Sequence, residues 1–312
     1  MSEQHSLRRF GRRVWKDFKR RVEKPNKRIH YEQAAEELFD LCRSPALSID
    51  GIENALSFHP LAFAARDIND KLPLHVVCGA FKSGGGSADV VEYLLKLYPD
   101  SVCEQNCYRD LPLHVACGGG APLQVVQRLY EQTQLRGCIN KEMWDKIGLW
   151  TPLHSACTGG CSLLEVIRYL VKEYRGILKQ HPIGEVCCTP LHLACGNGAA
   201  TGVIKYLVEQ WPNVVRLCDS SGRLPLHKAC YVRQSLQLED IQCLVEEWPE
   251  SLQEKEHERG ATPLHCACGK KTSVGIVQYL LEQWPEAVRI KDCKGRLPLQ
   301  NACMGTESYG RR

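Results

Sequence analysis

The sequence lacks any long apolar segment. No stretch approaches the ~20 consecutive apolar residues that span a bilayer. The first residues, Met1 to His5, lead directly into arginines without the hydrophobic core of a secretory signal. We therefore expect no transmembrane span and a soluble, intracellular protein that is cytoplasmic, nuclear or both.

The sequence also lacks the motifs that mark common catalytic centres. It contains no G-x-S-x-G nucleophile elbow, no H-E-x-x-H zinc-protease helix and no protein-kinase signature. We therefore predict that the chain is not an enzyme, and we expect neither a cofactor nor a small-molecule substrate.

Strong charge is missing from most of the chain, because the excess of basic residues is confined to the N-terminus. The whole chain has 40 Lys and Arg against 36 Asp and Glu, and residues 1–28 contain eleven basic and three acidic side chains. The remainder is weakly acidic, which disfavours nucleic-acid binding through phosphate neutralisation. Only the N-terminal arm, residues 1–28, is suited to an anionic surface.

Residues 1–28 are predicted to form a basic, amphipathic or disordered arm. Apolar residues recur among the basic ones at steps of three or four: Leu7, Phe10, Val14, Phe18 and Val22. Such a segment can lie on an anionic membrane, bind a calmodulin-like groove, or act as a nuclear address or organelle presequence. It can equally be a solvated tail that folds only when bound.

The rest of the chain is built on a repeat. The string Pro-Leu-His-x-x-Cys occurs six times, and a seventh copy, Leu297 to Cys303, has glutamine in the histidine position. The smallest spacing between copies is 35 residues, the size of one helix-turn-helix unit. The histidines are His75, His114, His154, His192, His227 and His265, and the cysteines are Cys78, Cys117, Cys157, Cys195, Cys230, Cys268 and Cys303.

The residue pattern of each repeat unit predicts a short helix followed by a longer amphipathic helix. The motif proline suits the first helical turn, and a second proline, as in Trp211-Pro212, ends the longer helix. His59-Pro60 has the same spacing to the next motif, which predicts a degenerate entry repeat over residues 30–63, with helices near 31–42 and 52–58. After Cys303 too few residues remain for a second helix, so the last unit is half a repeat or the sequence is truncated.

The motif from Thr189 to Gly198 resembles the ankyrin signature T-P-L-H-x-A-A-x-x-G, with Cys195 in place of the second alanine. Residues 151–157 and 262–268 repeat it, and residues 219–223 and 292–296 resemble the D-x-x-G-x finger loop of that family. The resemblance implies an all-α, ankyrin-type helical repeat solenoid with short finger loops, a degenerate N-terminal capping repeat and a C-terminal half repeat. We expect the array at residues 29–303 and a short tail at 304–312.

The resemblance also implies a function. Ankyrin-type arrays act as non-catalytic scaffolds or adaptors, with a concave surface of finger loops and first helices facing a protein partner. The motif histidine is expected to hold backbone groups of its own and the adjacent turn, and the motif cysteine to lie in the core. The expected partner-binding residues are Lys71, Tyr108, Asp110, Trp150, Thr158, Asn197, Ser220, Ser221, Arg223, Tyr231, Lys270, Lys294 and Arg296, and Cys188 and Ala261 stand at equivalent positions.

Two further hypotheses remain open. The arm can tether the array to a membrane or nucleic acid, or the cysteines and histidines can form a metal-binding or redox-sensing array. His154, Cys157 and Cys161 share one helix face, although Gly159-Gly160 should end that helix first. Cys103 and Cys107 are expected together in one finger loop. In a reducing compartment we expect the 18 cysteines to be free thiols.

Overall fold

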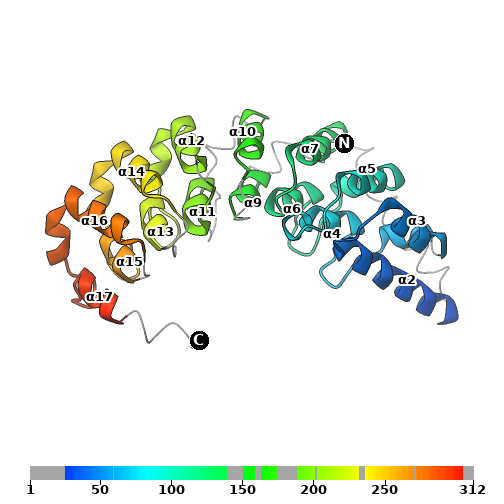
Figure 1. Ribbon diagram of the computed structural model, residues 1–312, viewed down its shortest axis with the longest axis horizontal. Coiled ribbons are helices and arrows are strands. Elements are labelled where there is room, and N and C mark those ends of the chain that lie inside the picture. Colours follow the sequence, from blue (N-terminus) through cyan, green and yellow to red (C-terminus); the bar gives the residue numbers. More distant parts are fainter. Residues whose placement is uncertain are drawn as a thin grey trace. The chain divides into compact units, whose positions relative to one another are not determined.

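The computed structural model describes residues 25–58, 60–138, 150–158, 163–173, 188–200, 202–231, 236–269 and 272–304. These residues fall into two compact units, one within Met1–Asn140 and the other within Lys141–Arg312. All regular structure in the described part of the chain is helical, which confirms the all-α repeat prediction (Figure 1).

Unit 1 consists of helix pairs stacked side by side. Helices α2, α4 and α6 contact one another in an inner row, and α3, α5 and α7 form the outer row. The bounds are α2 Pro25–Arg43, α3 Ile49–Phe58, η1 Pro60–Ala64, α4 Pro73–Gly79, η2 Phe81–Ser83, α5 Ala88–Leu97, η3 Pro99–Cys103, α6 Pro112–Gly118 and α7 Leu123–Leu135.

Unit 2 repeats the same arrangement. Helices α9, α11, α13, α15 and α17 contact their neighbours in the inner row, and the outer helices α12, α14 and α16 do the same. The bounds are α9 Pro152–Thr158, α10 Leu164–Glu173, α11 Pro190–Asn197, α12 Val203–Gln210, η5 Pro212–Arg216, α13 Pro225–Tyr231, α14 Leu238–Glu247, η6 Pro249–Leu252, α15 Pro263–Gly269, α16 Val274–Gln283, η7 Pro285–Arg289 and α17 Pro298–Met304.

The degenerate entry repeat is present as the pair α2 and α3. Helix α2 takes the inner position and packs on α4, while α3 packs on α5. Helix α2 begins at Pro25, inside the segment that the charge pattern assigned to the arm. Proline is favoured in the first helical turn, which accounts for the early start. Residues 1–24 of the arm lie outside the described residues.

Burial of the motif leucine shows how the repeats stabilise one another. Leu74, Leu113, Leu153, Leu191, Leu226 and Leu264 are all 3% exposed or less, whereas Leu299 of the last copy is 73% exposed. Full burial of one leucine contributes about 1.5–3 kcal/mol. Helix α17 is the last described element, and no outer helix follows it among the described residues.

A proline follows each of the outer helices α3, α5, α12, α14 and α16, and each of these prolines begins a short 3-10 helix. The sequence analysis did not predict these 3-10 helices. The N–H of Trp211 still closes the last turn of α12 by donating to the carbonyl of Leu207 at 3.1 Å. Pro212 then starts η5. Arg216 at its end lies over the Trp248 ring of the next repeat, 5.2 Å from its centroid. The 3-10 turns therefore join neighbouring repeats.

A disulfide joins Cys103 to Cys138 in unit 1, with Cα atoms 5.3 Å apart. The expectation of free thiols is wrong for this pair. The placement of Cys103 in a finger loop is also wrong, because Cys103 ends η3, which packs against α7. Cys138 follows α7, and its N–H donates to the carbonyl of Thr133 at 3.0 Å. The bond ties the end of one repeat to the end of the next.

We predict that reduction destabilises unit 1. A disulfide that closes a loop of this size contributes roughly 2–4 kcal/mol to the free energy of unfolding. Dithiothreitol should therefore lower the melting temperature of the wild-type protein measured by circular dichroism. Cys138→Ser should lower it without the reductant and remove its further effect, whereas Cys107→Ser, which changes an exposed thiol, should leave the effect intact. Equal melting of the wild type with and without reductant would contradict the assignment.

Candidate functional site

Each motif histidine holds the start of its own helix. The imidazole Nδ1 accepts the backbone N–H of the residue that opens the motif, at 3.1 Å for Leu72 to His75 and 3.2 Å for Leu224 to His227. The same contact exists at His114, His154, His192 and His265. Gln300 replaces it in the last copy, where its Oε1 accepts the N–H of Leu297 at 2.7 Å.

The other ring nitrogen reaches the next repeat. With Nδ1 as the acceptor, Nε2 carries the proton and donates. It donates to the carbonyl of Asp110 from His75 at 3.2 Å and to that of Arg223 from His192 at 2.9 Å. His227 donates to Ala261 and His265 to Arg296 in the same way. Each of these imidazoles therefore couples a helix start to the following finger loop.

Burial keeps these histidines neutral. Desolvation lowers the pKa of His75, His154, His192 and His227 to about 4, although backbone carbonyls act in the opposite direction. His75, His192 and His227 also make hydrogen bonds at both ring nitrogens. A ring with this pKa and with both nitrogens engaged is poorly suited to acid-base catalysis near neutral pH.

The motif cysteines pack in the core. Cys78, Cys117, Cys157, Cys195 and Cys230 are buried, and Cys268 is half-buried. Desolvation raises the pKa of Cys157 to about 12 and raises the pKa of Cys78, Cys195, Cys230 and Cys268 in the same direction. Thiols held protonated are weak nucleophiles and weak metal ligands. The side chain of Cys303 is not among those that the structure describes.

Within the described residues, no group of three or more His, Cys, Asp or Glu side chains is arranged to hold a metal ion. Cys161, the third member of the candidate set with His154 and Cys157, lies outside those residues. Among the described helices none is long and apolar enough to cross a membrane.

The finger loops are shaped by their first residue. In the loop from Asp219 to Arg223, Oδ1 of Asp219 accepts the N–H groups of Ser221 and Arg223, both at 2.9 Å. Asp67, Asn106 and Asp292 make the same pair of contacts in their loops. Such a turn satisfies two backbone donors from one side chain, which fixes the course of each loop.

Adjacent finger loops are joined through their backbones. The N–H of Cys107 donates to the carbonyl of Asn69 at 3.0 Å in unit 1. In unit 2 the N–H of His257 donates to Ser221 at 3.0 Å, and that of Cys293 donates to Arg259 at 2.8 Å. The loops of each unit therefore form a connected ladder and present their side chains from a fixed backbone.

One position near the end of every described finger loop is left-handed. Gly222, Gly260 and Gly295 occupy it in unit 2. In unit 1 it is taken by Asp70 at φ 59° and Arg109 at φ 66°, although residues with a Cβ rarely adopt this region. Unit 1 therefore has two charged side chains where unit 2 has glycine.

The expected partner-binding residues differ in exposure. Tyr108 is 67% exposed, and Asn197, Ser220 and Lys294 are exposed as well. Lys270 lies outside the described residues. The two additional positions, Cys188 and Ala261, are buried at 8% and 6% and do not offer a side chain to a partner. The half-buried members are Lys71, Asp110, Trp150, Thr158, Ser221, Arg223, Tyr231 and Arg296.

Several of the half-buried residues also have structural contacts. The Trp150 ring lies 5.5 Å from the ring of His154, centroid to centroid. Thr158 donates to the carbonyl of Ser155 at 2.7 Å. Replacement of Trp150 therefore affects packing around a buried histidine as well as the surface.

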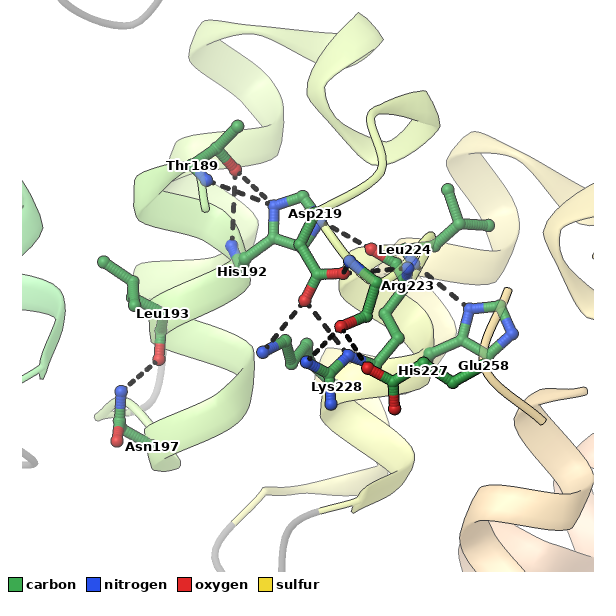
Figure 2. A network of polar contacts seen from close by, with 11 residues as sticks. Thr189, His192, Leu193, Asn197, Asp219, Arg223, Leu224, His227, Lys228 and Glu258 are labelled. Atoms are coloured by element: carbon green, nitrogen blue, oxygen red, sulfur yellow. Dashed lines mark hydrogen bonds and ion pairs between the residues drawn. The ribbon is translucent and has the colours of Figure 1, made fainter. Parts of the chain in front are cut away.

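A polar network centred on Asp219 lies where α11 and α13 meet the finger loops (Figure 2). Oδ2 of Asp219 contacts Nε of Arg223 and Nζ of Lys228, both at 3.1 Å. Burial raises the pKa of Asp219, but hydrogen bonds from Arg223 and Lys228 outweigh it, so the pKa lies below its ordinary value. Ser221 donates to Glu258 at 2.8 Å and links this loop to the next.

The sequence did not indicate three members of this region: Lys228, Glu258 and Arg259. Lys228 directly follows the motif histidine, and Arg259 donates to the Tyr231 hydroxyl at 2.8 Å. Glu258 and Arg259 lie in a loop that lacks the D-x-x-G-x pattern. The spacing could have indicated that this loop is different, because Thr262 lies 13 positions after Pro249, whereas the equivalent pairs in other repeats are 12 positions apart.

Comparisons with known proteins agree with this geometry. A family model described as ankyrin repeats in three copies matches residues 74–181, and a model of the single ankyrin repeat matches residues 187–219 and 259–292. Together they cover more than half of the chain. No curated protein sequence gives a significant match.

Among solved structures, the human ASB11 ankyrin repeat domain is similar, with 20% identity and a TM-score of 0.53 over 81% of this chain and 96% of that chain. A complex of the predatory endopeptidase Bd0816 with the immunity protein Bd3460 from Bdellovibrio bacteriovorus also matches. It shows 20% identity and a TM-score of 0.49 over 62% of this chain and 91% of that chain.

We predict that stability falls as the solution is acidified from neutral pH. The buried histidines have a pKa of about 4 when folded, below the ordinary value of about 6.5 that applies when unfolded. Only the unfolded state gains protons between these values, so the stability present above about pH 6.5 is lost as pH falls towards 4. Each histidine contributes roughly 1 kcal/mol per pH unit.

Urea denaturation at several pH values measures this loss. His227→Gln should reduce it, because glutamine supplies the same acceptor in the last repeat and does not titrate. The exposed His257 provides the matched control, and His257→Gln should retain the wild-type loss. An unchanged loss in His227→Gln would show that buried histidines do not cause the acid sensitivity.

Proposed function

Because the chain belongs to the ankyrin-repeat family, whose repeats are a general protein-protein interaction module, we propose that it is a non-catalytic scaffold or adaptor. Its finger loops and inner helices are the surface offered to a protein partner. The observation that carries the proposal is the connected ladder of finger loops within each unit.

A fixed backbone favours binding because little loop entropy is lost when a partner docks. The first residue of the loop holds two backbone N–H groups, and neighbouring loops bond to one another. Side chains at the tips, such as Ile68 and Tyr108, remain exposed. An exposed tyrosine on a rigid support is a common anchor of binding energy.

A non-catalytic role is supported by the state of the motif residues. Burial holds the imidazole of His192 neutral, and both of its ring nitrogens are hydrogen-bonded, as they also are in His75, His227 and His265. Burial likewise keeps the Cys195 side chain as a thiol. These groups stabilise the array, so recognition is left to the variable positions around them.

The proposal predicts that tip residues control partner binding. Tyr108→Ala and Ser220→Arg should each weaken a partner that co-purifies with the full chain, by tenfold or more if Tyr108 is an anchor worth about 1.4 kcal/mol. Isothermal titration measures the affinity, and circular dichroism checks that both variants remain folded. Arg223→Ala should act in the same direction, since Lys228 still neutralises Asp219.

The matched control is Glu246→Arg on the outer helix α14, where the side chain is exposed. It should leave the affinity unchanged. A partner that tolerates the finger-loop variants but is lost with Glu246→Arg would place binding on the outer face. A partner that is lost only when residues 1–24 are deleted would assign recognition to the arm.

A further inference from the structure

The finger loops and inner helices of unit 2 present positive charge to solvent. Two loops end in arginine, Arg223 and Arg296, and a third contains Arg259. Lys228 on α13 and Lys294 in the last loop add to them. We refer to Arg223, Lys228, Arg259, Lys294 and Arg296 as the cationic strip.

The neutralising carboxylates lie beneath this strip. The side chains of Asp219 and Asp292 are 1% and 0% exposed, whereas those of Arg223 and Arg296 are 30% and 26% exposed. Oδ2 of Asp292 contacts Nη2 of Arg296 at 2.7 Å, and Asp219 contacts Arg223 and Lys228. A solvent-side ligand therefore meets cations first.

The buried carboxylates also orient the cations. A guanidinium has five N–H donors, and the contacts of Arg223 within the described residues engage Nε with Asp219 and Nη2 with Ser221. Because the guanidinium is planar, these two contacts also fix the direction of its remaining N–H groups. Figure 2 shows Arg223 and Lys228 both directed at the Asp219 carboxylate. Less side-chain entropy is lost when such a cation binds an anion.

The spacing of the strip limits the shape of its partner. Helices α11, α13, α15 and α17 are successive neighbours, and packed helices lie about 8–10 Å apart. An extended polypeptide rises about 3.3 Å per residue. Cations one repeat apart therefore match side chains about three residues apart on an extended chain.

We propose that the cationic strip of unit 2 binds an extended protein segment with acidic side chains at about every third position. This inference rests on the proposed partner-binding role of the finger loops and specifies the partner that unit 2 accepts. Glu258 should repel such an acidic segment, because it directly precedes Arg259 of the strip, is exposed, and accepts a hydrogen bond from Ser221.

Nucleic acid fits the strip less well than an acidic polypeptide. A nucleic-acid strand carries one phosphate per about 3.4 Å of helix axis, a much denser array of charge than one or two cations per repeat. The outer face of unit 2 also exposes carboxylates that repel phosphates: Glu209, Glu246, Glu247, Glu250, Glu282 and Glu286.

The test uses the full chain and two fluorescent peptides of identical composition. One has glutamate at every third position with glycine and serine between, and its isomer has the same glutamates adjacent to one another. Fluorescence anisotropy at low salt should show tighter binding of the spaced peptide, by about fivefold or more for several exposed charge pairs. Added salt should weaken that binding.

Three charge-changing variants make the test specific. Lys294→Glu should weaken the spaced peptide, whereas Lys205→Glu, the same change on the exposed outer surface of α12, should not. Glu258→Gln should strengthen it, a gain that a merely structural residue would not produce. Circular dichroism confirms that each variant is folded.

Equal binding of the two peptides, or equal losses for Lys294→Glu and Lys205→Glu, would overturn the inference, as would tighter binding of single-stranded RNA than of the spaced peptide. A partner that depends on the finger loops but is insensitive to salt and to Lys294→Glu would refute this inference while leaving the proposed function in place.

Discussion

The array depends on one buried imidazole in each of the six repeats that contain the motif histidine. Its Nδ1 accepts the N–H that opens the motif helix, and in four of the described repeats its Nε2 donates to a carbonyl in the next finger loop. A single side chain thus satisfies a helix terminus and fixes the neighbouring repeat, which backbone groups alone cannot do because helix starts leave N–H groups unpaired. The ring must stay neutral for both contacts, and burial ensures this by lowering its pKa.

Because the motif histidine must stay neutral and hydrogen-bonded, the residues that hold the array together differ from those that are free to vary at its surface. The motif residues are buried: the histidine bridges repeats, the leucine fills the core, and the cysteine lets inner helices approach closely. The finger loops carry the variable side chains on a backbone held by an Asp or Asn side chain and by bonds between loops. Chemistry at the motif would disrupt the array, whereas variation at the loop tips costs little stability, so binding specificity can change without changing the fold.

The two units use this freedom differently. Unit 1 exposes Ile68 and Tyr108 at its loop tips and tolerates left-handed Asp70 and Arg109. Unit 2 places glycine at the left-handed position and exposes lysine and arginine above buried carboxylates. The loop tips of unit 1 therefore expose apolar and aromatic side chains beside the charged Asp70 and Arg109, whereas the loops of unit 2 carry mainly basic side chains. A disulfide between Cys103 and Cys138 further stabilises unit 1.

The sequence by itself determined the repeat, its period, the starts of the motif helices and the prolines that end the outer helices, because these depend on local hydrogen bonding and periodic burial. It also determined the entry repeat through the position of Pro60. Tertiary structure alone decided that Cys103 meets Cys138, that Cys188 and Ala261 face inward, and that Lys228 reaches Asp219. Each of these depends on the packing of neighbouring elements and on the exact length of the loops between them. A repeat pattern does not specify that length. The loop from Glu256 to Ala261 has one added residue, and it places the buried Ala261 directly before the motif, where other loops have the half-buried Arg223 and Arg296.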